Sequence, residues 1–315
     1  MSRKSKRLLL IPLMIALLVI LTGCGSANET PIEGFSGLTD ILVWPIAGMM
    51  WLIGNVISNY GIVIIIATLI IRTLAWPIYA KTNDMSLKMQ IMGPELQKIE
   101  SKYEGKEDQE TKQRKQMETM ALYKKYGVGI GGCLTPILQF PLFIAFYETL
   151  RRIPKTIGEQ FTLNFGIMNH TFLGIDLFEG STLSPEALEL GLIDPNFQKY
   201  GIWALAIIVA LSQIISQILM MRRQKKQQAE MYIDVPDYRQ PQKTDQQKSQ
   251  GMMMNIFAFS MSIMMALFVL RSPAALGLYW LVGNLYTMLQ SYLNARGSMK
   301  RKDKLKIKFN GGSDK

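Results

Sequence analysis

Long apolar runs constrain the fold of this chain more than any other feature of its sequence. Five runs of about 20 residues each contain at most one charged side chain, and a helix of that length crosses a hydrocarbon core of about 30 Å. They cover residues 60–80, 132–150, 201–221, 252–270 and 274–293. The pattern predicts an all-α membrane protein with five transmembrane helices, and it excludes a water-soluble enzyme.

The charged residues predict the orientation of these helices. The chain has 35 Lys and Arg against 24 Asp and Glu, a formal net charge of +11. In a soluble protein such an excess suggests nucleic-acid binding, whereas in a membrane protein it collects on the cytoplasmic side. The basic residues here flank the apolar runs, whereas the charged residues within the segment 153–200 are mainly Asp and Glu. We therefore expect residues 153–200 outside the cell and a basic cytoplasmic tail at residues 297–315.

Residues 1–23 have the features of a lipoprotein signal peptide. A basic start, an apolar stretch and small residues follow one another in that order before Cys24. Leu21, Thr22, Gly23 and Cys24 resemble the bacterial lipobox, in which the Cys thiol receives a lipid outside the cytoplasm. The alternative is an uncleaved anchor helix with an incidental Cys. The lipobox and the loop charges independently predict a multi-pass protein of a bacterial plasma membrane with its N-terminus outside.

Two further segments are expected to be helical. Residues 38–59, within an extracellular segment 24–59, are apolar but interrupted by Gly, Pro and polar residues. We expect an interfacial helix on the outer surface there, with a sixth span as the alternative. The loop at residues 81–130 is too long for a simple connector, and apolar residues recur at helical spacing on both sides of Gly105. This predicts a cytoplasmic helical hairpin, with a second cytoplasmic loop at residues 222–251.

Arg72 is the sharpest functional signal, because it lies inside the first apolar run. An Arg at the centre of a membrane helix costs about 2.5–3.5 kcal/mol on insertion scales. One interpretation is that its side chain extends towards the inner headgroups. The other is that it faces polar groups of the remaining spans, which lie at a similar depth. The candidate residues of such an inner-leaflet groove are Gln139, Gln213, Gln217 and Asn284.

These polar residues have two interpretations. Hydrogen bonds between the helices would satisfy them without any further function. Alternatively, they line a wet groove that is open to the cytoplasm and closed outside, with Arg72 as its full charge. No Asp or Glu lies deep in a span, which disfavours an ion-coupled transporter. A small-solute transporter and a membrane assembly scaffold are two functions that stay open.

The sequence offers little for catalysis or cofactor binding. A single His, His170, and two Cys exclude a His-based metal site and a disulfide framework. Residues 127–132 match the dinucleotide pattern GxGxxG, but they lack the strand that must precede it. We therefore expect a protein that is not an enzyme and that binds no metal or cofactor.

Motifs along the whole chain resemble the YidC/Oxa/Alb family of membrane protein insertases, in the lipoprotein form of Gram-positive bacteria. They are the lipobox, the Ile71-Arg72 step followed by Pro77, YKKYGVGIGGCLTPILQFPLFIAFYETLRR from residue 123, SQIISQILMM from residue 212 and PAALGLYWLVGNLYTMLQ from residue 273. The family often has Asn-Pro where this chain has residues 127–131, which suggests a local loop difference.

The resemblance implies an insertase and chaperone that acts alone or beside the Sec translocon. Arg72 would attract acidic residues in the extracellular segment of a nascent membrane protein, and the fifth-span aromatic of the groove falls on Trp280. The family's polar third-span position falls on Gln213 or Gln217, and both stay open. The hairpin would receive the substrate. The basic tail would contact the ribosome or, as the alternative, anionic lipids.

Overall fold

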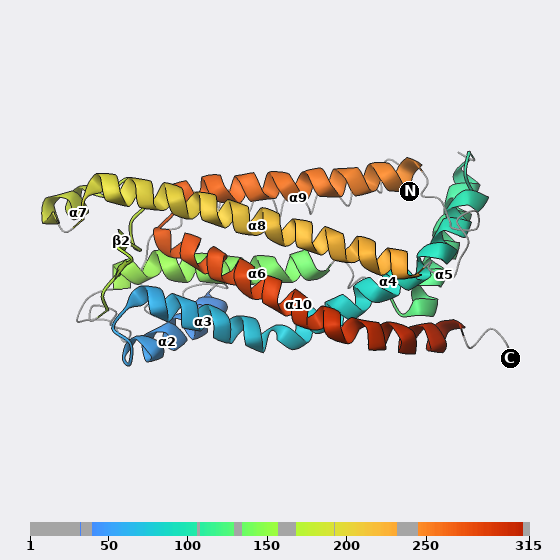
Figure 1. The fold of residues 1–315 in the computed structure, drawn as a ribbon, viewed down its shortest axis with the longest axis horizontal. Coiled ribbons are helices and arrows are strands. Elements are labelled where there is room, and N and C mark those ends of the chain that lie inside the picture. The colour runs from blue at the N-terminus through green and yellow to red at the C-terminus, as the bar shows by residue number, and fades with distance from the viewer. Residues whose placement is uncertain are drawn as a thin grey trace.

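The computed structural model describes residues 32, 40–105, 108–128, 134–156, 168–191, 193–231 and 245–310. The predicted signal peptide and Cys24 lie outside these residues. The described chain is mostly helical, with one two-stranded antiparallel sheet (Figure 1). Its elements are α2 (Asp40–Gly54), α3 (Tyr60–Leu74), α4 (Trp76–Lys102), α5 (Gln109–Tyr126), α6 (Leu134–Arg152), the 3-10 helix η2 (Ile153–Thr156), β1 (Thr171–Phe172), β2 (Ile175–Asp176), α7 (Pro185–Leu190), α8 (Pro195–Met231), α9 (Asp245–Arg271) and α10 (Ala274–Asn310).

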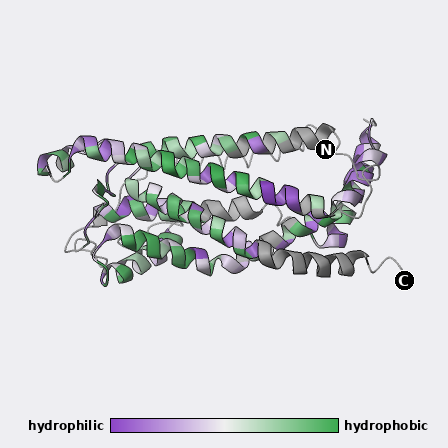
Figure 2. Ribbon diagram, in the orientation of Figure 1, coloured by the Kyte–Doolittle hydropathy of each residue, from purple (hydrophilic) through white to green (hydrophobic). Residues whose placement is uncertain are grey.

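The long helices lie side by side along the longest axis of the molecule, and α10 is central among them (Figure 1). It packs against α3, α4, α6, α8 and α9. Hydrophobic residues dominate the middle of the bundle, whereas the α4–α5 pair at one end is largely hydrophilic (Figure 2). Among the described residues, one helix, at Pro195–Lys226, is both long and apolar enough to cross a membrane. Shorter apolar helices cover Asp40–Gly54, Tyr60–Leu74 and Phe259–Arg271, so the count of five spans stays a prediction.

The first apolar run is not one continuous helix, which differs from the expectation. α3 ends at Leu74, and α4 begins at Trp76 with Pro77 in its first turn. Proline has no backbone N–H and fits at a helix start, where that N–H would have no intrahelical partner. Ala75 closes α3 by donating its N–H to the Ile71 carbonyl, and its own carbonyl accepts the N–H of Tyr79. The chain therefore bends just after Arg72 and continues directly into the expected hairpin.

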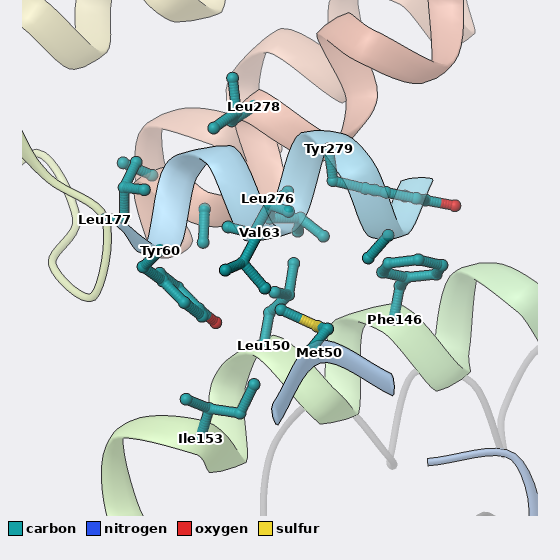
Figure 3. Close-up of a cluster of buried hydrophobic side chains, with 14 of the residues drawn as sticks. Met50, Tyr60, Val63, Phe146, Leu150, Ile153, Leu177, Leu276, Leu278 and Tyr279 are labelled. Carbon is teal, nitrogen blue, oxygen red and sulfur yellow. The ribbon is translucent and has the colours of Figure 1, made fainter. Parts of the chain in front are cut away.

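The main core forms where α2, α3, α6 and α10 meet. Met50, Tyr60, Phe146, Leu150 and Tyr279 are almost completely buried there, and Figure 3 shows their side chains converging from these helices. The Phe146 and Tyr279 rings stack with centroids 4.3 Å apart. If lipid surrounds the bundle, such side chains stabilise it by close packing, because lipid tails are as apolar as the core.

A buried ion pair fastens α2 to α6. Asp40 Oδ1 accepts a hydrogen bond from Arg152 Nη1 at 2.5 Å, and both residues are buried. The apolar residues Val43, Ala47 and Met50 of α2 also face the core, whereas Ile41 and Leu52 are exposed. α2 is thus an integral part of the bundle, and its position at the outer membrane surface stays a prediction.

Residues 168–184 cap the ends of several helices. The Asn169 carbonyl accepts the first N–H of α3, from Tyr60. The carbonyls of Glu179 and Leu177 accept the first two N–H groups of α10, and Ser181 donates to the Leu270 carbonyl at the end of α9. Helix ends leave such groups without intrahelical partners, so this polar segment satisfies them. It lies at the opposite end of the bundle from α4 and α5 (Figure 1).

The α4–α5 hairpin has a small core of its own and two matching polar clamps. Its core consists of Ile91, Met92, Leu122, Tyr126 and Val128. Glu118 of α5 accepts hydrogen bonds from Lys102 and Tyr103 at 2.6 and 2.8 Å. Glu95 of α4 accepts them from Lys125 and Tyr126 at 2.9 and 2.7 Å. At the end of each helix, a Lys-Tyr pair therefore donates hydrogen bonds to a glutamate of the other helix. These bonds set the register of the hairpin.

The buried Asp40–Arg152 pair yields a stability prediction. Asp40→Ala leaves a buried guanidinium without its carboxylate, and breaking such a pair costs about 3–5 kcal/mol. We expect thermal unfolding in detergent, followed by circular dichroism, to occur at a clearly lower temperature. The control is the double variant Asp40→Leu/Arg152→Met, which removes both charges and should recover most of the loss. Equal losses in the single and double variants would show that packing of α2, rather than the charge pair, provides the stability.

The single histidine of the chain yields a prediction about pH. His170 Nδ1 lies 2.9 Å from Asp176 Oδ1, and this hydrogen bond raises the pKa of His170 above its ordinary value of about 6.5. The protonated ring therefore stabilises the capping segment below that value, and the contribution is lost as the pH rises through the folded-state pKa. Titration by NMR after histidine labelling should give a pKa above 6.5. Asp176→Asn should lower it, and an unchanged pKa would contradict the assignment.

Candidate functional site

Arg72 is buried in the seam between α3 and α10. The residue is 8% exposed, and its Nε atom is buried without a hydrogen-bond partner in the described part of the chain. No ion pair to Arg72 is found among the described residues either. The guanidinium lies against Gly283 of α10, where an added Cβ would be 2.7 Å from Nη2. The predicted intramembrane arginine is therefore a buried cation without a counter-ion among the residues described.

A hydrogen bond next to Arg72 joins α3 to α10. Thr73 Oγ1 lies 3.0 Å from Tyr286 Oη and 2.7 Å from the Leu69 carbonyl. The Thr73 hydroxyl has one hydrogen, and the carbonyl can only accept, so Tyr286 donates to Thr73. The Tyr286 ring also meets Trp76 edge-on, with centroids 6.1 Å apart. These contacts fix the two helices relative to each other within one turn of Gly283.

The polar residues of α8 and α10 are only partly brought together. Asn284 Nδ2 donates to Ser212 Oγ of α8 at 2.9 Å, as the interpretation of interhelical hydrogen bonding expects. Gln213 and Gln217 are half-buried and share one face of α8. Neither makes a hydrogen bond within the described part of the chain, so the choice between them stays open. Gln139 lies in α6, but its side chain is outside the described residues.

Trp280 packs into an aromatic cluster one turn before Gly283. Its ring stacks on Phe143 of α6 with centroids 5.5 Å apart and meets Phe268 of α9 at the same distance. Residues three apart are neighbours on a helix, so Trp280 and Gly283 lie next to each other on the surface of α10. The structure thus places Trp280 and Asn284 close to the residue that contacts Arg72, and Trp280 has an evident packing role there.

The structure adds two residues of α10, Gly283 and Gln290, to the candidate site. Neither of them was selected as a site residue from the sequence. Gly283 has no polar group and gave no signal as a binding residue. Gln290 was visible as a polar residue within the last apolar run. It is 5% exposed, and its Nε2 atom has no hydrogen-bond partner in the described part of the chain. It lies seven residues after Gly283, on the same face of α10.

The chemical character of this site is set by the guanidinium of Arg72. A guanidinium offers several N–H donors in one plane and binds carboxylates through charge-assisted hydrogen bonds. No group of three or more His, Cys, Asp and Glu side chains that could hold a metal ion occurs in the part of the chain that the structure describes. The guanidinium of Arg72, which has no counter-ion among the residues described, therefore suits an acidic ligand.

The Thr73–Tyr286 hydrogen bond yields a prediction for the seam. Tyr286→Phe removes the donor but leaves the Thr73 hydroxyl its bond to Leu69. We expect a small loss in the free energy of unfolding, about 0.6–1 kcal/mol. Thermal unfolding in detergent measures it, and Tyr200→Phe, at an exposed residue, is the matched control. A loss equal to that of the control would show that aromatic packing alone holds this contact.

Comparison with known proteins places the whole bundle in one family. Residues 51–302 match the family model described as 60Kd inner membrane protein. The chain is 31% identical over 291 residues to membrane protein insertase YidC 2 of Bacillus anthracis, covering 91% of this chain and 93% of that protein. It is 31% identical to membrane protein insertase MisCA of Bacillus subtilis, with 91% of each chain covered, and 32% identical to membrane protein insertase YidC of Oceanobacillus iheyensis, with 94% and 99% covered. The chain therefore belongs to the 60Kd inner membrane protein family, the family of the YidC insertases.

Proposed function

We propose that this protein inserts membrane proteins into a bacterial plasma membrane and assists their folding, alone or with the Sec translocon. The relatives that share over nine-tenths of the chain are named membrane protein insertases. The observation that carries the mechanism is the buried guanidinium of Arg72, which has no counter-ion among the described residues. We infer that Arg72 attracts carboxylates in the extracellular segment of the incoming substrate.

The physical argument concerns the cost of moving a polar segment through hydrocarbon. Polar groups that lose water without new hydrogen bonds cost several kcal/mol each. A groove formed by Arg72, Gln139, Gln213, Gln217, Asn284 and Trp280 shortens the dry part of the path. In its low-dielectric surroundings, the attraction between the Arg72 guanidinium and a carboxylate is stronger than in water. The apolar segment of the substrate then leaves sideways into the lipid.

The proposed topology has five spans, with the N-terminus outside and the C-terminus in the cytoplasm. Cys24 carries the lipid anchor, and residues 153–200 lie outside. Two observations support this arrangement. The described part of residues 153–200 lies at one end of the bundle and the α4–α5 hairpin at the other (Figure 1). The strongly basic end of α10 extends towards the hairpin end (Figure 1), as the excess of Lys and Arg in cytoplasmic segments requires.

The proposed partners follow from this topology. The α4–α5 hairpin receives nascent membrane proteins as they leave the ribosome. The basic tail at residues 297–315 contacts the ribosome, or it binds anionic lipids with a gain of about 1 kcal/mol per basic residue. No bond is made or broken by the protein in this mechanism, so no cofactor is needed.

Complementation in cells depleted of their own insertase tests the proposal. The substrate is a single-span protein with a short extracellular tail, made in an acidic form and in a form with amides in place of the carboxylates. We expect the wild type to insert both. Arg72→Ala should insert the acidic form about tenfold less well, because the substrate loses one charge-assisted hydrogen bond. Arg72→Lys keeps the positive charge and should retain part of the activity.

Arg271→Ala is the matched control, because it removes an exposed positive charge from the end of α9. The amounts of folded protein are compared in all strains. Equal insertion by Arg72→Ala and the wild type would exclude the proposed role of Arg72. Failure of a well-expressed wild type would favour a transporter or an assembly scaffold instead.

A further inference from the structure

We propose that Gly283 is a positioning residue for Arg72: its missing side chain forms the seat that sets where the guanidinium lies. The inference rests on the proposed role of Arg72 in attracting substrate carboxylates. A Cβ at residue 283 would lie 2.7 Å from Arg72 Nη2, 3.5 Å from Cζ and 3.6 Å from Nε. All three of its nearest atoms therefore belong to one guanidinium. The space that a side chain would take on α10 is the space that this group occupies.

Other glycines of the chain show that this contact is specific. For a Cβ at Gly277, six residues earlier on α10, the three nearest atoms would be apolar atoms of Leu205 and Val269. At Gly48 and Gly93, in α2 and α4, it would meet nothing within 4 Å. Gly283 is also in the middle of a regular helix, where Gly costs up to about 1 kcal/mol relative to Ala. Its backbone conformation does not require Gly, so room for Arg72 is the physical gain.

The neighbouring contacts decide what moves when Gly283 is enlarged. The Thr73–Tyr286 hydrogen bond and the stacking of Trp280 on Phe143 hold α10 against α3 and α6 on either side of residue 283. The helices therefore resist separation, whereas the guanidinium is the far end of a flexible side chain. It must shift by at least about 0.7 Å to reach an ordinary contact distance of 3.4 Å from the new methyl group.

Such a shift affects recognition more than stability. Charge-assisted hydrogen bonds depend on donor distance and angle, and a binding group must be held within about 0.5 Å of its productive position. Gly283→Ala should therefore fold as well as the wild type and still misplace the charge. Gly283→Val should misplace it further.

Chemical modification tests the position of Arg72 directly. Phenylglyoxal modification of Arg72, followed by mass spectrometry on the folded protein in detergent, should be at least about threefold faster in Gly283→Ala than in the wild type. Gly277→Ala is the matched control and should leave the rate unchanged. Unfolding temperatures are measured for each variant. Unchanged rates in both Gly283→Ala and Gly283→Val would overturn the proposal, whatever the role of Arg72 in insertion.

Insertion assays then test the consequence. Gly283→Ala should reduce insertion of the acidic substrate by about three- to tenfold, because one hydrogen bond to Arg72 is no longer made. Insertion of the amide form should stay unchanged. In an Arg72→Ala background the same substitution should have no further effect, because the two residues act through one contact. An equal reduction in that background, or with the amide substrate, would show that Gly283 serves packing alone. Wild-type insertion by Arg72→Ala itself would instead exclude the proposed role of Arg72 and leave the modification rates to decide the positioning.

Discussion

The buried guanidinium of Arg72 depends on a close seam between α3 and α10, and the surrounding contacts hold that seam together. α10 packs against α3, α4, α6, α8 and α9, so its position is set by the whole bundle. Gly283 lets the two helices approach with a large cation between them. A buried charge is costly, and the Tyr286 hydrogen bond and the aromatic cluster of Trp280 supply rigidity on either side of it.

Two buried arginines in this protein illustrate two uses of one side chain. Arg152 is paired with Asp40 and joins two helices, so its charge is satisfied within the chain. Arg72 is equally buried, but the described chain offers it no carboxylate. A buried ion pair contributes little net stability yet strongly penalises the loss of one partner, which suits a fastening between helices. The lack of a carboxylate partner among the described residues is the reason that we propose an acidic ligand for Arg72.

Many polar contacts of the described residues lie at the two ends of the bundle. At one end, residues 168–184 cap α3, α9 and α10 and include the His170–Asp176 pair. At the other end, the α4–α5 hairpin is held by Glu95 and Glu118. Helix packing among apolar residues dominates the middle, where the seam of Arg72 lies. This division agrees with a bundle that crosses a membrane, because lipid cannot satisfy polar groups that water can.

Local patterns in the sequence determined which segments are helical and showed that Arg72 lies within an apolar run. The apolar runs, the turn at Gly105 and the polar residues Asn284 and Gln290 were visible without a structure. Pro77 was visible as well, but its local effect, the break at Ala75, was not predicted. Only the tertiary structure decided which residues meet: Asp40 with Arg152, Trp280 with Phe143, and Gly283 with Arg72. Helix formation follows from residues within about four positions of one another. A partner 112 residues away, or an empty space beside a glycine, exists only once the helices have packed.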